Sequence, residues 1–95
     1  MRLEKSNTIE NLWIYILSLA YENEVYAYSL QKDIEEKFGF LPGKITPYRV
    51  LYKLEKEGFV ESKLKDRRRI YKITKKGKEE FNGAKVFFKK QAQKL

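Results

Sequence analysis

Cysteine and histidine are both absent from the 95 residues of this sequence. The lack of cysteine excludes disulfide bonds and thiolate chemistry. The lack of histidine removes the commonest metal ligand and the usual general base near neutral pH. Two pairs of adjacent carboxylates remain, but they fall on predicted helices, where neighbouring side chains diverge: Glu35 with Glu36, and Glu79 with Glu80. We therefore expect no enzymatic activity, no metal and no cofactor.

Long apolar runs are missing as well. The longest stretch without a charged residue spans 11–21, whereas a membrane-spanning helix needs about 20 residues. Arg2 and Lys5 near the N-terminus are followed by Glu10 and by no small-residue cleavage site, so no secretory signal is predicted. Hydrophobic residues make up 42% of the chain, which is enough for one compact core. We expect a single domain, residues 1–95, that works in the cytoplasm.

Acidic residues are scarce in the second half of the sequence. Residues 1–43 carry a net charge of −3 and residues 44–95 a net charge of +11, within a total of +8. Charge segregated in this way concentrates positive potential over one surface and attracts polyanions, and the isoelectric point of 9.6 is typical of nucleic-acid-binding domains. A basic surface that serves only solubility is the alternative, but it would not leave the first 43 residues net acidic.

The first half of the chain predicts two helices. Asn7 and Glu10 have the spacing of a capping box, and apolar residues then recur at helical intervals over about 8–22. This helix is apolar nearly all round, so it is either central to the core or in contact with another subunit. A second, amphipathic helix is expected over about 27–38, with Gly39 as its C-terminal cap.

The second half predicts a third helix and a hairpin. Thr46 followed by proline favours a helix start, with threonine as the cap, and the helix should span about 47–57. Two short strands then follow, joined by the charged turn 65–68.

The last helix is expected over about 75–92, capped by Thr74 and paired with the first helix. Gly77 and Gly83 should weaken it by about 1 kcal/mol each relative to alanine. The whole chain therefore predicts a mainly α-helical fold with a small β-hairpin: a winged helix-turn-helix of three helices, a two-stranded wing and a fourth helix.

Helices 27–38 and 47–57 have the spacing of a helix-turn-helix, whose second helix can lie in the major groove of DNA. Arg49 can contact guanine through two hydrogen bonds, while Tyr48 and Tyr52 can bond phosphate or pack on a thymine methyl group. Alternatively, the tyrosines are packing residues and Arg49 is a solvated cation. The residues on or beside this helix that we expect to contact DNA are Lys44, Thr46, Tyr48, Arg49, Tyr52 and Lys53.

The hairpin and the start of the last helix are strongly basic, with nine basic residues and one acidic residue between positions 63 and 78. Such a wing can reach phosphates or a narrow minor groove, where negative potential favours arginine. Its charges could instead serve only to protect an exposed sheet edge. The wing residues that we expect to contact DNA, on the same face as Arg49 and Lys53, are Lys63, Lys65, Arg67, Arg68 and Arg69.

From about Ile16 to Phe81 the sequence resembles the PadR-like winged-helix transcriptional regulators. The resemblance lies in the segments ILSLAYENEVYAYSLQKDIEE, ITPYRVLYKLEKEGFVES and RRRIYKITKKGKEEF. Where the family often has His-Gly-Tyr at the start of its second helix, this chain has Tyr26-Ala27-Tyr28.

The resemblance implies a homodimer that binds palindromic operators and represses transcription. It implies that the dimer is held by the helices over about 8–22 and 75–92, which gives the interface candidates Ile9, Leu12, Trp13, Ile16, Phe81, Ala84 and Phe88. Some family members also bind small aromatic molecules near the dimer centre, which makes Trp13 a candidate for contact with such an effector. An ordinary core or interface tryptophan is the alternative.

The leading hypothesis is therefore a sequence-specific, dimeric transcriptional regulator. A non-specific architectural DNA-binding protein is a second hypothesis, motivated by the net charge of +8. A winged-helix protein-interaction module, with its basic face against an acidic partner, is a third.

Overall fold

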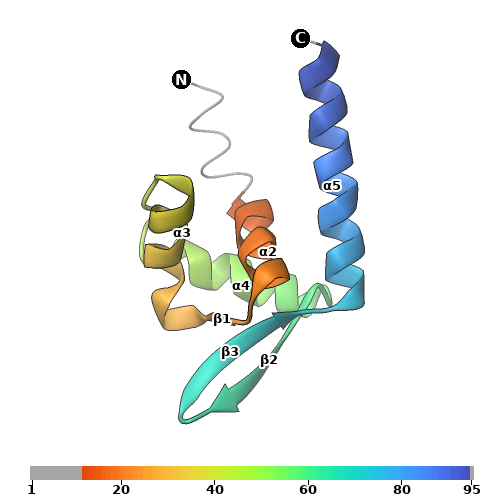
Figure 1. The fold of residues 1–95 in the computed structure, drawn as a ribbon. Coiled ribbons are helices and arrows are strands. Elements are labelled where there is room, and N and C mark those ends of the chain that lie inside the picture. Colours follow the sequence, from red (N-terminus) through yellow and green to blue (C-terminus); the bar gives the residue numbers. More distant parts are fainter. Residues whose placement is uncertain (1–11, 95) are drawn as a thin grey trace.

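Four α-helices and a three-stranded sheet make up the part of the chain that the structure, a computed structural model, describes: residues 12–94, without the side chains of Phe88 and Lys94. The elements occur in the order helix, strand, helix, helix, hairpin, helix (Figure 1). Their bounds are α2 (Leu12–Glu22), β1 (Val25–Tyr26), the short 3-10 helix η1 (Ala27–Ser29), α3 (Leu30–Phe38), α4 (Thr46–Lys56), β2 (Val60–Lys65), β3 (Arg68–Ile73) and α5 (Lys75–Lys94).

Helix α2 lies at the centre of the core. Its residues Leu12, Ile16, Leu17 and Ala20 are buried and pack with apolar side chains from every other helix and from the sheet. Its apolar character had allowed two roles, a place in the core or contact with another subunit, and the structure shows the first. The expected start of this helix at residue 8, its capping box and Ile9 all lie outside the described residues.

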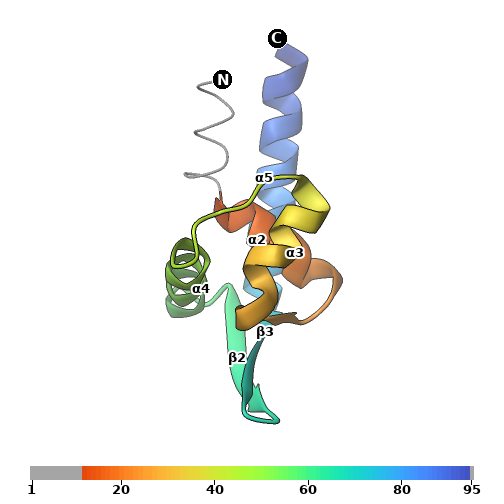
Figure 2. The same ribbon diagram turned by 90° about the vertical axis from the view of Figure 1, so that its left-hand side faces the viewer.

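The sheet has the strand order β1-β3-β2, with both pairs antiparallel. The hairpin of β2 and β3 is the predicted wing, and it extends away from the helices (Figures 1 and 2). Strand β1 (Val25–Tyr26) was not predicted: the sequence indicated only a short connection between the helices expected over 8–22 and 27–38. Val25 and Tyr26 pair with Tyr71 and Ile70 of β3. A strand of two residues is too short to show the alternation of apolar and polar residues by which strands are recognised in a sequence.

The helix ends agree with the predictions in part. Gly39 closes α3 in the left-handed conformation (φ 81°), and its N–H donates to the carbonyl of Glu35. Thr46, in contrast, is not the cap of α4: it is the first residue of the helix, and Ile45 occupies the cap position without a side-chain bond. The backbone of Ile45 already has helical angles (φ −87°, ψ −31°), so the helix begins one residue early.

The C-terminal end of α4, the start of β2 and the start of α5 meet at one junction. The carbonyl of Phe59 accepts a hydrogen bond from the N–H of Thr74 (3.0 Å). The hydroxyl of Thr74 donates to the carbonyl of Gly58 (2.6 Å) and accepts from the N–H of Gly77 (3.0 Å), so Thr74 caps α5 as predicted. Gly58 allows the chain to turn between α4 and β2, because it has a φ of 85°, a value that residues other than glycine rarely adopt.

Gly77 has a role that the sequence analysis did not foresee. It is buried, and a β-carbon at this position would lie 2.1 Å from the carbonyl oxygen of Phe59 and 2.7 Å from the side chain of Ile73. The lack of a side chain is therefore what lets α5 approach the junction.

Among residues 12–94, no helix is long and apolar enough to cross a membrane.

Stability measurements on two glycine variants test the junction. We expect Gly77→Ala to lower the free energy of unfolding by about 1–3 kcal/mol, because the new methyl group overpacks against backbone. Gly83→Ala is the matched control, since a β-carbon there meets nothing within 4 Å, and it should raise stability by up to about 1 kcal/mol. Urea denaturation followed by circular dichroism measures both values. Equal changes in the two variants would contradict the close approach at Gly77.

Candidate nucleic-acid interface

Helix α4 buries one face and exposes the other, as its sequence pattern predicts. Pro47, Leu51 and Leu54 are buried in the core. The side chains on the outer face are exposed and comprise Tyr48, Arg49, Tyr52, Lys53 and Lys56. Thr46, at the first position of the helix, is half-buried. The outer face therefore combines two aromatic rings with three cations.

One side of this outer face continues onto η1 and α3. Tyr48 and Lys44 line a hollow of about 260 Å³ together with Tyr28 and Gln31. Gln31 donates to the carbonyl of Pro42 (2.6 Å), which fixes the loop between α3 and α4. The start of α4 and the start of α3 thus form one surface.

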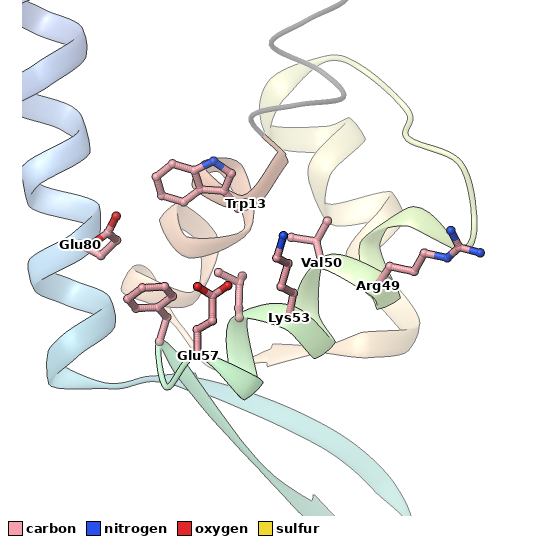
Figure 3. Close-up of a pocket in the computed structure, with 8 residues that line it drawn as sticks. Trp13, Arg49, Val50, Lys53, Glu57 and Glu80 are labelled. Carbon is pink, nitrogen blue, oxygen red and sulfur yellow. The ribbon is translucent and has the colours of Figure 1, made fainter.

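The other side of the outer face borders a pocket of about 450 Å³ between α2, α4 and α5 (Figure 3). Trp13 supplies an aromatic wall, and Lys53 of α4 points toward it, facing Glu80 of α5 across the pocket. Arg49 lines the edge of the same pocket, but its side chain extends away from Trp13 along α4. Lys53 and Arg49 therefore lie on the flank of α4 opposite Tyr48.

The wing ends in a two-residue turn in which neither residue is glycine. Asp66 and Arg67 both have positive φ values, 51° and 65°. This is the pattern of a type I′ turn, whose twist matches that of the strands it joins. Lys65 and Arg68 pair directly across the last rung of the ladder, so the tip of the wing carries three adjacent cations.

The three consecutive arginines do not share one direction. Successive side chains of a strand point to opposite faces of the sheet. Arg68 donates a hydrogen bond to the hydroxyl of Tyr28 (3.0 Å), and its guanidinium carbon lies 4.7 Å from the centre of that ring. This cation–π contact ties the wing to η1, and through Tyr28 to the surface formed by Lys44 and Tyr48.

Arg69 points to the other face of the wing, toward α4. It donates to the hydroxyl of Ser62 (2.9 Å), which in turn donates to the carboxylate of Glu55 on α4 (2.5 Å). The chain Arg69–Ser62–Glu55 fixes the angle between the wing and α4. Lys63 lies exposed on β2, opposite Ile70.

Tyr71 lies beside this chain of hydrogen bonds. Burial raises the pKa of its phenol above the ordinary value of 10.0; the Glu55 carboxylate adds to the rise, and Arg69 opposes it.

Five of the predicted site residues thus separate into two groups. Lys44, Tyr48 and Arg68 are brought together by Tyr28, which sequence reasoning did not select. The signal for Tyr28 was present, because it stands in the Tyr26-Ala27-Tyr28 segment where the resemblance shows a departure. The other group, Arg49 and Lys53, flanks the surface on the side of the Trp13 pocket instead of facing the wing.

The residues expected at a subunit interface differ in how much surface they offer. Leu12 and Ile16 are fully buried by their own chain, so their side chains are not available to a partner. Phe81 is nearly buried and packs on the ring of Tyr21 (5.3 Å between centroids). Trp13 and Ala84 are half-buried. Ile9 and the side chain of Phe88 lie outside the described part of the structure.

Comparison with protein families gives one match relevant to this surface. The model of the family described as "Transcriptional regulator PadR-like family" matches residues 16–83. No curated protein sequence matches the chain.

Several solved structures share the fold. A transcriptional regulator from Clostridium thermocellum superposes with a TM-score of 0.85 at 27% identity, over 93% of this chain and 90% of that protein. A PadR family transcription regulator from Clostridium difficile gives a TM-score of 0.74 at 25% identity, over 86% and 94%. Bacillus subtilis PadR, solved in complex with operator DNA, gives 0.68 at 24% identity, over 79% of this chain and 46% of that one.

A pH series on Tyr71→Phe tests the environment at the root of the wing. As the pH rises through 10, the unfolded chain loses the Tyr71 proton before the folded chain does, because the folded pKa is the higher. The free energy of unfolding should therefore fall, at a rate limited to about 1.4 kcal/mol per pH unit for one proton. Urea denaturation between pH 8 and pH 11 should show a smaller fall in the free energy of unfolding for Tyr71→Phe, which lacks the phenol. Parallel curves would contradict the raised pKa.

Proposed function

This chain belongs to the transcriptional regulator PadR-like family, and we propose that it acts as a homodimeric repressor that recognises a palindromic operator sequence. The observation that carries the proposal is the surface of Lys44, Tyr48, Tyr28 and Arg68, which joins α4 to the wing without interruption. Positive charge is concentrated in the same half of the chain. The operator complex of Bacillus subtilis PadR supports duplex DNA as the ligand.

In this proposal α4 lies in the major groove. Its outer face presents Tyr48, Arg49 and Tyr52 to base edges, while Lys44, Thr46 and Lys53 bond phosphates beside them. Lys44 precedes the helix on the side of the wing, and Lys53 lies on the opposite flank. The helix is therefore bordered by cations on both sides, as a helix between two phosphate backbones requires.

The wing contacts the backbone or the adjacent minor groove with Lys63, Lys65, Arg67, Arg68 and Arg69. Its orientation is fixed from both faces, by Arg68 on Tyr28 and by Arg69 through Ser62 on Glu55. A wing held in this way reaches the backbone at a constant distance from α4.

The dimer forms through α5 and the exposed part of α2. The C-terminal half of α5 extends beyond the other helices (Figure 1), and Val86 and Phe87 on it are each more than half exposed. Trp13 of α2 lines a pocket with Glu80 of α5, and Ala84 lies one turn further along α5. Two subunits related by a two-fold axis would place their α4 helices about 34 Å apart, one turn of DNA.

Two further parts of the proposal follow from the family. The first is that the protein works in the cytoplasm. A small aromatic effector, as some family members bind, would fit the pocket beside Trp13 and would there contact Lys53 of α4.

Selection from random duplex DNA tests the function directly. We expect a palindromic motif with half-sites about 10 base pairs apart, because the two-fold dimer presents two copies of α4. Recovery of no motif, with affinity described by the salt dependence alone, would favour the architectural hypothesis instead. Failure to bind any duplex at about 100 mM salt would favour the protein-interaction hypothesis.

Two variants of α4 separate base contacts from phosphate contacts. Arg49→Ala should lower the affinity for the selected site by about 1–3 kcal/mol and leave binding to random DNA nearly unchanged. Lys53→Ala is the matched control, since loss of a phosphate contact should weaken both complexes equally. It should also reduce the slope of log affinity against log salt concentration by about one. Fluorescence anisotropy with both duplexes measures the ratio. An equal loss on both duplexes for Arg49→Ala would remove its assignment to a base.

The dimer is tested on α5. Val86→Glu should convert the dimer to a monomer in analytical ultracentrifugation and lower operator affinity by about a hundredfold, because the second half-site no longer adds to the first. The fold should be unaffected, because Val86 is 54% exposed. Asn23→Glu adds the same charge at an exposed position outside α5, in the connection between α2 and β1, and should leave the dimer intact. A monomeric wild-type protein would contradict this part of the proposal.

A further inference from the structure

An apolar stripe runs along the outer face of α4 and contributes nothing to the core. It consists of Ile45, Tyr48 and Tyr52, which are 64%, 49% and 67% exposed. Because Ile45 has helical backbone angles, the three positions follow one helical course and fall within an arc of about 60° at 100° per residue. Scattered exposed apolar residues need no explanation, but three on one helical stripe do.

The surroundings of the stripe are cationic. Lys44 precedes it, Lys56 lies at its far end, and Arg49 and Lys53 flank it. The two acidic side chains of this region are directed elsewhere: Glu55 accepts from Ser62, and Glu57 lines the Trp13 pocket. The occupant of the stripe must therefore be apolar at its centre and anionic at its edges.

The major groove of a thymine-containing duplex has this chemistry. Its floor carries the C5-methyl groups of thymine, and phosphates line both sides. Helix α4, Thr46–Lys56, contains no asparagine or glutamine, so the carboxamide that reads adenine through two hydrogen bonds is not available on it. Apolar contact with thymine is the readout that the stripe can make.

We infer that Ile45, Tyr48 and Tyr52 read thymine by packing on its methyl group in each half-site. The inference rests on the proposed function and adds to it the type of base that is read. Ile45 and Tyr52 are seven residues apart, or about 10 Å along the helix. At 3.4 Å per base pair, the two outermost methyl groups should lie about three base pairs apart.

Uracil scanning of the selected operator tests the inference. Uracil differs from thymine only by the missing methyl group, so replacing one thymine at a time keeps base pairing and charge. We expect a loss of about fourfold in affinity at each contacted thymine, the value for one methyl group returned to water. The sensitive positions should span about three base pairs in each half-site, with the Ile45 and Tyr52 contacts outermost and the Tyr48 contact between them.

Variants then assign each methyl group to a side chain. In Ile45→Ala the uracil effect at one of the two outermost positions should vanish, and in Tyr52→Ala the effect at the other. Both side chains are exposed, so neither change should alter the melting temperature. Leu41→Ala is the control, because Leu41 is 58% exposed but lies in the loop before α4, and it should keep both effects.

The outcomes distinguish the inference from the function on which it rests. If no duplex is preferred over random DNA, the proposed function fails. If a preferred operator exists but no uracil substitution changes its affinity more than twofold, the function stands and the methyl readout is wrong. Uracil effects that persist in both Ile45→Ala and Tyr52→Ala would overturn the assignment to this stripe.

Discussion

The contact between the Phe59 carbonyl and the first turn of α5 is the constraint on which the remaining geometry depends. Helix α4 ends there, strand β2 leaves from there, and α5 begins there. Thr74 bonds both sides of the contact, and Lys76 reinforces it with a hydrogen bond to the carbonyl of Glu57 (2.8 Å) and a position over the ring of Phe59. A shift at this point would move the proposed recognition helix, the wing and the proposed dimer helix relative to one another.

The acidic and basic halves of the chain carry out different tasks. The first half supplies about half of the buried core, chiefly through α2 and α3, and the ion pair of Lys37 with Glu22 ties the ends of these two helices together. The second half supplies the rest of the core and the cationic surface. Within it, Arg68 and Arg69 are exposed and also hold the wing in place, whereas Lys65 and Arg67 at the tip are exposed and belong to the surface alone.

Sequence reasoning recovered most of the fold because its signals are local. Gly39 and Thr74 are found by their chemistry at helix ends, and the buried and exposed faces of α4 follow from helical periodicity. Strand β1 was missed because it is defined by pairing with β3, not by its own two residues. Gly77 was expected only to weaken α5, because its closeness to the Phe59 carbonyl is a tertiary contact that no local sequence pattern indicates.

The candidate surface was predicted less completely than the fold. The residue types on α4 and on the wing were identified, but their division between the two flanks of α4 depends on where Trp13 and Tyr28 lie in space. Strand alternation in the run Arg67-Arg68-Arg69 could have indicated opposite directions for the last two. The exposure of Ile45 depends on the helix starting at Thr46, one residue before the position that the threonine-proline pair suggests.

The turn at Asp66 and Arg67 has a consequence for how fast and how tightly the wing can engage a surface. Holding two L-residues in the left-handed region costs about 1–2 kcal/mol each, which glycine would avoid. In return the strands stay paired up to Lys65 and Arg68, and the guanidinium of Arg67 projects from the end of a rigid ladder. The wing is pre-organised, so little conformational entropy remains to be lost on contact. A glycine-rich tip would avoid the backbone strain but would lose conformational entropy each time it became ordered on binding.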